Sequence, residues 1–471
     1  MSAAAPRAGR PSPLGASGAT SRAGPGSRLI GAVRRAPTPV RLRALLHAVW
    51  VLAVVLSLVG AGALASARAA LQKIGKDSAP SILAAQAVSA GLADLDALAG
   101  NDLLGDRARR QDAIPAFDKR RAQVTAALVT AARSVTSGDA ALVPVDTILD
   151  GLGRYLELVA EARYRKDLAD HAGAVRTYEA ASDLLHLRLL PAADTLDAES
   201  RHQLESEYHR QADRGGLHAV IAGLVGGLLV AVLGAGQLFL YRRTRRILNV
   251  PLLGATVVAA ASTLYLAGSI AAARADLRRA KVDAFEPIHA LSRARALAHD
   301  ARGDQTRYLL VPDRAPLFER EYRDKIARLD GRPHLDPGAT ASPPGDGGLF
   351  ADARRHVTFP GAREAVASML LAFAAFDRLD EQLRALERAG KHDRAVDLCV
   401  GAVSDQAPAV FDRFDRALLA AVDIDQRELD RTVDEGLRAL GAAIAIGPIA
   451  SLLVALLAFL GVRPRLREYA A

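Results

Sequence analysis

Few residues of this 471-residue chain have the types and spacing that chemistry requires. The segment HQLESEYH places His202, Glu205 and His209 at i, i+3 and i+7, on one helical face that could hold a metal ion. No further strong ligand is evident nearby, so a solvated helix face is the simpler interpretation. The chain has no Gly-rich phosphate loop, Gly-x-Ser-x-Gly elbow or His-Glu-x-x-His pair, and its one cysteine, Cys399, excludes an intramolecular disulfide. We therefore expect no enzyme, no metal and no cofactor.

Two other histidines begin a pattern that the chain repeats, HAGAV at 171–175 and HDRAV at 392–396. Ligand contact and pH sensing are the functional readings of such histidines. We favour a structural reading, in which the pattern marks a tight turn between the third and fourth helices of a duplicated domain. The histidines would lie in the turn, and the Ala and Val residues would re-enter the core: His171, Ala174, Val175, His392, Ala395 and Val396.

The elements that must position these residues are helices. Half of the residues are hydrophobic but only 4% are aromatic, and Ala and Leu dominate, which is typical of long helices. Four stretches of membrane-spanning length contain no Asp, Glu, Lys or Arg: 45–66, 217–241, 251–270 and 440–462. GALASARA at the end of the first stretch resembles a signal-peptide cleavage site, but the run is long, and we interpret it as a retained anchor.

Arginine gives the orientation of these spans. Segment 1–44 contains eight arginines and no acidic residue, and we expect it to be a disordered cytoplasmic tail. Segment 242–250 has four arginines, and 463–471 has three arginines and one glutamate. Because short Arg-rich loops stay in the cytoplasm, we place both termini and the middle loop inside, and 67–216 and 271–439 outside. The net charge of +9 is then a topology signal, not evidence for nucleic-acid binding.

The two outer segments are predicted to be copies of one unit. ARAAL at 67–71 corresponds to ARADL at 273–277, and Pro80 corresponds to Pro287. Each copy has the apolar period of a helical bundle, with four antiparallel helices. In the first helix this period leaves three polar residues on the other face, Asp94, Asp96 and Asn101. Only the second copy contains a Pro- and Gly-rich stretch, 331–350, which we predict to be a mobile loop. The predicted fold is an all-α membrane protein with four transmembrane helices and two extracytoplasmic four-helix bundles.

This arrangement resembles the four-helix-bundle sensory domains of bacterial chemoreceptors and sensor kinases, on the early prolines and the 171–175 and 392–396 turns. We expect this chain to lack the signalling module that follows the fourth helix in those receptors. The duplicated four-span form resembles the GlnX family of membrane sensors. That resemblance implies a link between an exported amino-acid-binding lipoprotein and a cytoplasmic Ser/Thr kinase. We therefore expect a non-enzymatic sensor in the cell membrane that relays amino-acid availability.

Two alternative functions and the oligomeric state remain open. A scaffolding envelope protein would need the same layout, whereas a transport subunit is disfavoured because no span has a charged residue in its apolar core. A homo-oligomer is also left open. Neither bundle offers an evident site for a free amino acid, so we expect isolated 67–214 and 274–437 to bind a loaded lipoprotein instead. The kinase is expected to contact the inner arginines that follow the second span: Arg242, Arg243, Arg245 and Arg246.

Overall fold

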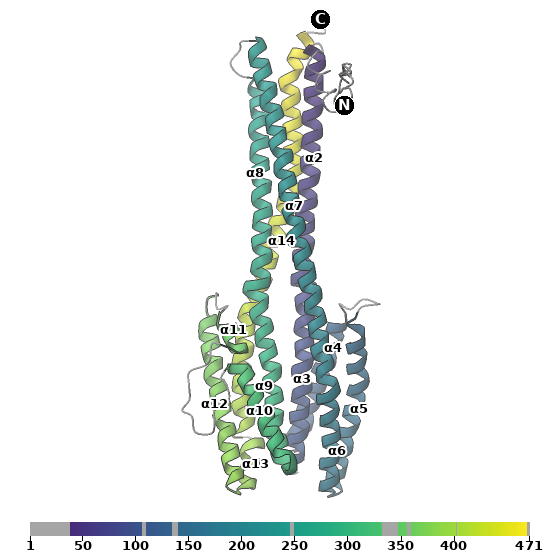
Figure 1. Ribbon diagram of the computed structural model, residues 1–471, viewed down its shortest axis with the longest axis vertical. Helices are drawn as coiled ribbons and strands as arrows, with labels where there is room; N and C mark the ends of the chain where they lie inside the picture. Colours follow the sequence, from purple (N-terminus) through teal and green to yellow (C-terminus); the bar gives the residue numbers. More distant parts are fainter. Residues whose placement is uncertain are drawn as a thin grey trace, which may run out of the picture. The chain divides into compact units, whose positions relative to one another are not determined.

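The computed structural model describes residues 38–105, 110–133, 140–244, 249–331, 347–355, 359–401 and 403–468. Every regular element in these ranges is a helix, which confirms the all-α prediction (Figure 1). The chain divides into two compact units. The first contains Met1–Leu56, Val225–Ser262 and Ile449–Ala471, and the second contains Ser57–Leu224 and Thr263–Pro448.

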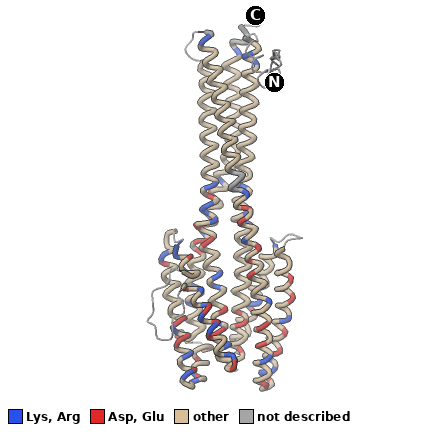
Figure 2. Tube along the Cα trace, in the orientation of Figure 1, with Lys and Arg blue, Asp and Glu red and all other residues tan. Residues whose placement is uncertain are grey.

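Four helices are long and apolar enough to cross a membrane, and the chain is a multi-pass membrane protein. They are α2 (Thr38–Gln72), α7 (Leu190–Thr244), α8 (Val250–Arg278) and α14 (Ala407–Glu468). Their apolar segments are uninterrupted by charge in Figure 2, as the sequence indicated. Within the first unit, Trp50 Nε1 of α2 donates to the Ala455 carbonyl of α14 at 3.2 Å, and Gln237 of α7 donates to Thr256 of α8.

The second unit contains the two outer segments. In its first bundle, apolar residues at steps of three and four turn inward, and Ile82, Leu92, Tyr155 and Tyr178 are almost fully buried. The first long helix of this bundle is α2 continued through a π-helical segment into α3. The bundle's elements are η1 (Lys73–Ser78), α3 (Ala79–Leu104), α4 (Arg110–Ala132), α5 (Leu142–Asp167), α6 (His171–Leu184), η2 (Leu185–Leu189) and the start of α7.

The second bundle has the same order of long helices with a more aromatic core. Phe350, Phe373, Phe376, Phe411 and Phe414 pack with ring centroids 4.8–6.4 Å apart. Most of the stretch predicted to be a mobile loop, 332–346, lies outside the described residues. The bundle's elements are η3 (Arg279–Phe285), α9 (Glu286–Leu310), η4 (Pro312–Arg314), α10 (Ala315–Asp330), α11 (Leu349–Arg355), α12 (Ala362–Arg388), α13 (His392–Val400) and the start of α14.

The early prolines coincide with π-helical turns that the sequence did not predict. Segment η1 immediately precedes α3, whose second residue is Pro80, and η3 immediately precedes α9, whose second residue is Pro287. A proline inside a helix has no N–H to donate and its ring crowds the carbonyl four residues earlier. A wider turn at this point relieves the crowding and keeps the helix continuous.

The two His-x-x-Ala-Val patterns each begin a helix after a tight turn. His171 and His392 are the first residues of α6 and α13, and both are exposed. In the first turn Ala169 has a φ of 62°, and the Asp170 carboxylate accepts from the Gly173 N–H at 2.9 Å. Ala174 and Ala395 are buried, whereas the valines that follow them are partly buried.

The fourth helices of the two bundles differ. In the first bundle α6, η2 and α7 form one uninterrupted helix from His171 to Thr244. In the second bundle α13 ends at Val400, and α14 begins only at Ala407. The chain is extended at Gly401, and Pro408 is the second residue of the new helix. A proline tolerated in a first helical turn explains why the new helix begins here.

Candidate functional site

The two bundles pack against each other through α3 and α9. Ile82 and Ile288 belong to one buried apolar cluster, and the contact becomes polar further along the two helices. Asp94 and Asp96 are 3% and 1% exposed. They are two residues apart and so face different sides of α3, contrary to the single polar face predicted from the sequence: Asp94 contacts Arg120 of α4, Asp96 contacts Ser182 of α6, and α9 contacts both. The polar contacts of the interbundle interface include Asp94 to His299 and Arg302, Asp96 to Arg307, Asn101 to Thr306, His186 to Asp300, Asp197 to His289, Glu205 to Lys281, and Glu179 and Asp183 to Arg314.

Asp94 is at the centre of one charge cluster. Its carboxylate lies 2.5 Å from Arg120 of α4, 3.1 Å from Arg302 and 3.2 Å from His299 of α9. Burial alone would raise the pKa of Asp94, but His299 and the two guanidinium groups hold it well below its usual value. Asp94 is therefore an ionised carboxylate that holds cations of both bundles.

His299 extends this cluster into the second bundle. Its Nε2 lies 3.3 Å from Asp415 of α14, and Arg295 makes a bidentate contact with the same carboxylate at 2.6 and 2.9 Å. Burial would raise the pKa of Asp415, and the contacts from His299 and Arg295 lower it well below the usual value. The ring of His299 packs edge-on against Phe411 at 4.8 Å. A contact made on α3 is thus linked to α14, which carries the last apolar span.

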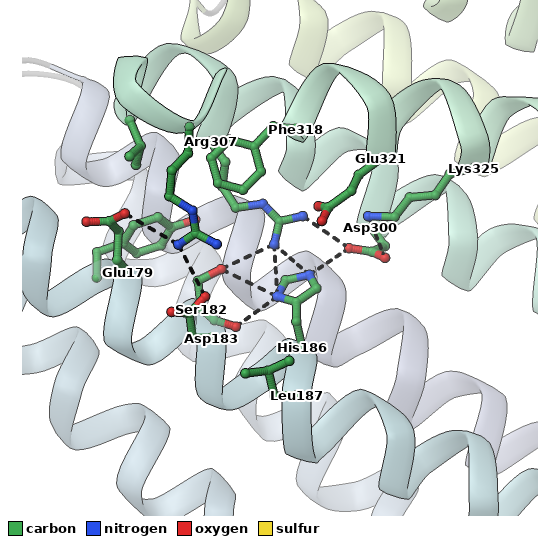
Figure 3. A pocket seen from close by; sticks show the side chains of 13 residues that line it. Glu179, Ser182, Asp183, His186, Leu187, Asp300, Arg307, Phe318, Glu321 and Lys325 are labelled. Atoms are coloured by element: carbon green, nitrogen blue, oxygen red, sulfur yellow. Dashed lines mark hydrogen bonds and ion pairs between the residues drawn. The ribbon is translucent and has the colours of Figure 1, made fainter. Parts of the chain in front are cut away.

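Arg307 is at the centre of a second cluster (Figure 3). Its guanidinium is 3% exposed and contacts Asp96 at 3.3 Å, Asp300 at 3.5 Å and Asp304. Burial would lower the pKa of Arg307, and these carboxylates raise it above its usual value, so the group stays charged. Lys325 of α10 lies 2.8 Å from Asp300 and 2.7 Å from Asp304.

A cavity of about 320 Å³ opens beside this cluster. It lies between α6 and η2 of the first bundle and α9 and α10 of the second. At its rim Arg314 reaches Glu179 at 3.5 Å and Asp183 at 3.4 Å. Figure 3 shows Glu179 and Asp183 on the left of the view, and Asp300, Glu321 and Lys325 on the right. Charged groups from both bundles therefore converge on one concave site.

Gly100 allows the close approach of α3 and α9. A Cβ added to it would lie 2.6 Å from Thr306 Cγ2 and 2.8 Å from the Tyr178 hydroxyl. Beside it, Thr306 donates to the Asn101 side chain at 2.8 Å. Only glycine fits here without moving one of the helices.

Residues 70–209 match the family model of the actinobacterial sensor domain. The match covers most of the first bundle and includes η1, α3 and the beginning of α7. It therefore contains the first-bundle side of the interbundle interface. No curated protein and no solved structure matches the chain. The matched domain, together with four apolar helices, supports a sensing role for a membrane protein.

The structure places the candidate residues of the sequence outside the interbundle clusters. His171 and His392 begin α6 and α13 on the surface, and His392 Nδ1 lies 3.0 Å from Glu387. Arg242 is exposed near the end of α7, whereas Arg245 and Arg246 lie outside the described residues. Arg243 is the next residue of α7 after Arg242.

The helical face that the sequence suggested as a metal site contains His202, Glu205 and His209, and one of these residues contacts the second bundle. Glu205 contacts Lys281 at 3.4 Å across the interbundle interface, and His202 and His209 are exposed. Among the described residues, no three His, Cys, Asp or Glu side chains lie close enough together to hold a metal ion.

Sequence reasoning missed the site itself. One signal was present, because α3 contains acidic residues but no Lys, Arg or His, whereas α9 contains four arginines and two histidines beside three acidic residues. Helices with opposite charge that each carry buried polar positions are candidates to pack on each other.

Proposed function

We propose that this chain is a non-enzymatic transmembrane sensor that relays amino-acid availability from an exported binding lipoprotein to a cytoplasmic Ser/Thr kinase. The observation that carries the sensing role is the sensor-domain match at 70–209, followed by α7, a single helix that runs from bundle residue Leu190 through an apolar span to Thr244. Displacement of a packed continuous helix is an established way to pass a signal. The lipoprotein and the kinase rest on the resemblance to GlnX-type sensors.

The proposal includes duplication of the sensor domain and an inward orientation of both termini. Duplication is supported by the matching π-helical segments before Pro80 and Pro287 and by the matching turns before His171 and His392. The orientation is supported by the arginines at 1–44, 242–250 and 463–471.

A disulfide across the interbundle interface tests the relay. A Cβ at position 100 would lie 2.6 Å from Thr306 Cγ2, so Gly100→Cys and Thr306→Cys are within reach of a disulfide. Cys399 would first be replaced by Ala, because it is the only native thiol. With the bond oxidised, we expect the change in cellular Ser/Thr phosphorylation that follows an amino-acid shift to disappear. The same double variant with its thiols reduced should respond, which controls for the crowding at position 100.

An unchanged response with complete cross-linking would reject a relay through this interface. A scaffolding role, the alternative, predicts that deleting the chain alters the envelope while phosphorylation still follows the amino-acid shift.

The inner partner is tested separately. Replacing Arg242 and Arg243 by Gln leaves Arg245 and Arg246 to maintain topology. We expect normal protein levels and a reduced phosphorylation response. A normal response would show that these arginines determine only topology.

A further inference from the structure

The cavity between the bundles has more carboxylates than cations. Four carboxylates line it, and Asp96 and Asp304 stand behind them in contact with Arg307, giving six acidic side chains around Arg307, Arg314 and Lys325. The four that line the cavity are Glu179, Asp183, Asp300 and Glu321. A concave site with excess negative charge favours a ligand that brings positive charge.

The inner and outer carboxylates differ in their pairing. Asp300 is in contact with Lys325, His186 and Arg307, so it needs no further cation. At the rim, Glu179 and Asp183 share one guanidinium, that of Arg314, at 3.5 and 3.4 Å, and Arg314 is 38% exposed. Within the described part of the chain, Glu321 has no ion pair, although it lines the same cavity. Three rim carboxylates therefore have one distant cation between them.

The rest of the lining indicates what kind of cation would fit. No described group of His, Cys, Asp and Glu has metal-binding proximity. Leu187, Val311 and Phe318 give the cavity an apolar wall that suits an alkyl chain. The Nε of Arg307, which also lines the cavity, is buried without a hydrogen-bond acceptor, and an acceptor oxygen on a ligand would satisfy it.

We propose that this cavity binds a small alkylammonium molecule, with its ammonium groups held at the acidic rim by Glu179 and Asp183 on the α6 wall and by Glu321 on the α10 wall. The proposal rests on the sensor role and adds a ligand class that the chain takes directly. Because α6 and η2 supply one wall and α9 and α10 the other, the site exists only when both bundles are packed together. It also disfavours dicarboxylates such as glutamate, which would add negative charge to an acidic rim.

The ligand class can be tested by calorimetry on the full chain in lipid nanodiscs. L-lysine and cadaverine carry the same alkylammonium group, but only lysine has a carboxylate. We expect both to bind and L-glutamate to give no heat. Tighter binding of lysine would identify an amino acid whose carboxylate meets the arginines, and equal or tighter binding of cadaverine would identify a diamine. Absence of heat with both amines, or binding of glutamate as tight as theirs, would overturn the proposal.

Variants of the charged residues at the rim of the cavity test the site directly. Asp183→Asn combined with Glu321→Gln should weaken binding of both amines at least tenfold, while Asp324→Asn, exposed on the same helix as Glu321, should change it less than twofold. Arg314→Gln removes the rim cation and should strengthen cadaverine binding about threefold, a gain that misfolding cannot produce. Unchanged affinity in the double variant would contradict the proposal. Failure here would leave the disulfide test of the sensor role unaffected.

Discussion

Nη1 of Arg302 donates to the carboxylate of Asp94 at 3.1 Å, across 208 positions of sequence. Each residue belongs to a different bundle, and both are almost fully buried. A buried ion pair of this kind contributes less by its attraction than by what is lost when one partner is removed. The interbundle interface is therefore intolerant of single charge deletions.

Replacing Asp94 by Ala should destabilise the chain by about 3–5 kcal/mol, because Arg120, Arg302 and His299 would lose their shared carboxylate. Thermal unfolding in detergent measures this. Asp118→Ala, which removes an exposed carboxylate paired with Arg121 one turn away, is the matched control and should cost less than about 0.5 kcal/mol. Equal effects of the two variants would show that the cluster adds nothing.

Gly100→Ala should cost about 1–3 kcal/mol, because the new methyl group meets Thr306 and Tyr178. Gly153→Ala is the control, since a Cβ there meets nothing within 4 Å and alanine favours helix by up to about 1 kcal/mol. Opposite shifts of the two melting temperatures are expected. Stabilisation by Gly100→Ala would mean that α3 and α9 do not approach this closely.

The stability that Asp94 and Asp415 contribute should be retained at mildly acidic pH. The pKa of Asp94 and that of Asp415 are lowered in the folded chain, so their contribution is present above the unfolded value of about 3.9 and is lost only as pH falls toward the folded values. The stability difference between the wild type and Asp94→Asn should stay constant from about pH 8 to pH 5 and shrink below about pH 4. A difference that already declines near pH 6 would contradict these assignments.

The contribution of Asp425 on α14 to folding stability should change with pH in the opposite direction. Burial raises its pKa to about 7, so the folded chain loses stability as pH rises from about 4 to 7. Asp425→Asn should therefore stabilise the protein at pH 8, by an amount on the order of 3 kcal/mol at most, and have little effect at pH 4. Melting temperatures at the two pH values decide this. Destabilisation at pH 8 would show that the carboxylate is ionised and paired.

The orientation can be tested with an impermeant thiol reagent on intact cells. Leu168→Cys, at an exposed position between α5 and α6, should be labelled, and Thr244→Cys at the end of α7 should not. Cys399 gives little background, because it is buried and burial raises the pKa of its thiol to about 11. Labelling of Thr244→Cys alone would reverse the assigned topology.

The sequence predicted what depends on local periodicity. Ile82, Leu92, Met369 and Phe373 were assigned to apolar helix faces, and all four are buried. The spans followed from composition alone. The partner of Asp94 could not be derived in this way, because period and propensity describe one helix and contain no information about a helix some 200 residues away. The single polar face assigned to α3 was wrong for Asp96, which lies against Ser182 of α6 inside its own bundle, because a helical period does not show which helix covers each side.

The π-helical turns and the break before α14 were missed for a different reason. Pro80, Pro287 and Pro408 were visible, but a proline in a first helical turn is compatible with a new helix, a wider turn or a regular start. Which of these forms depends on whether the helix before the proline continues. The preceding helix runs directly into α3 and into α9, whereas α13 ends before α14 begins.

Where α3 and α9 meet directly, the charges differ in sign, since α3 has Asp94 and Asp96 where α9 has Arg302 and Arg307. Two first halves facing each other through α3 would bury four carboxylates without a cation on either helix. Two second halves facing each other through α9 would set arginine against arginine. Each half is thus complementary to the other and repels a copy of itself, so the halves made as separate polypeptides should assemble as a one-to-one heterodimer.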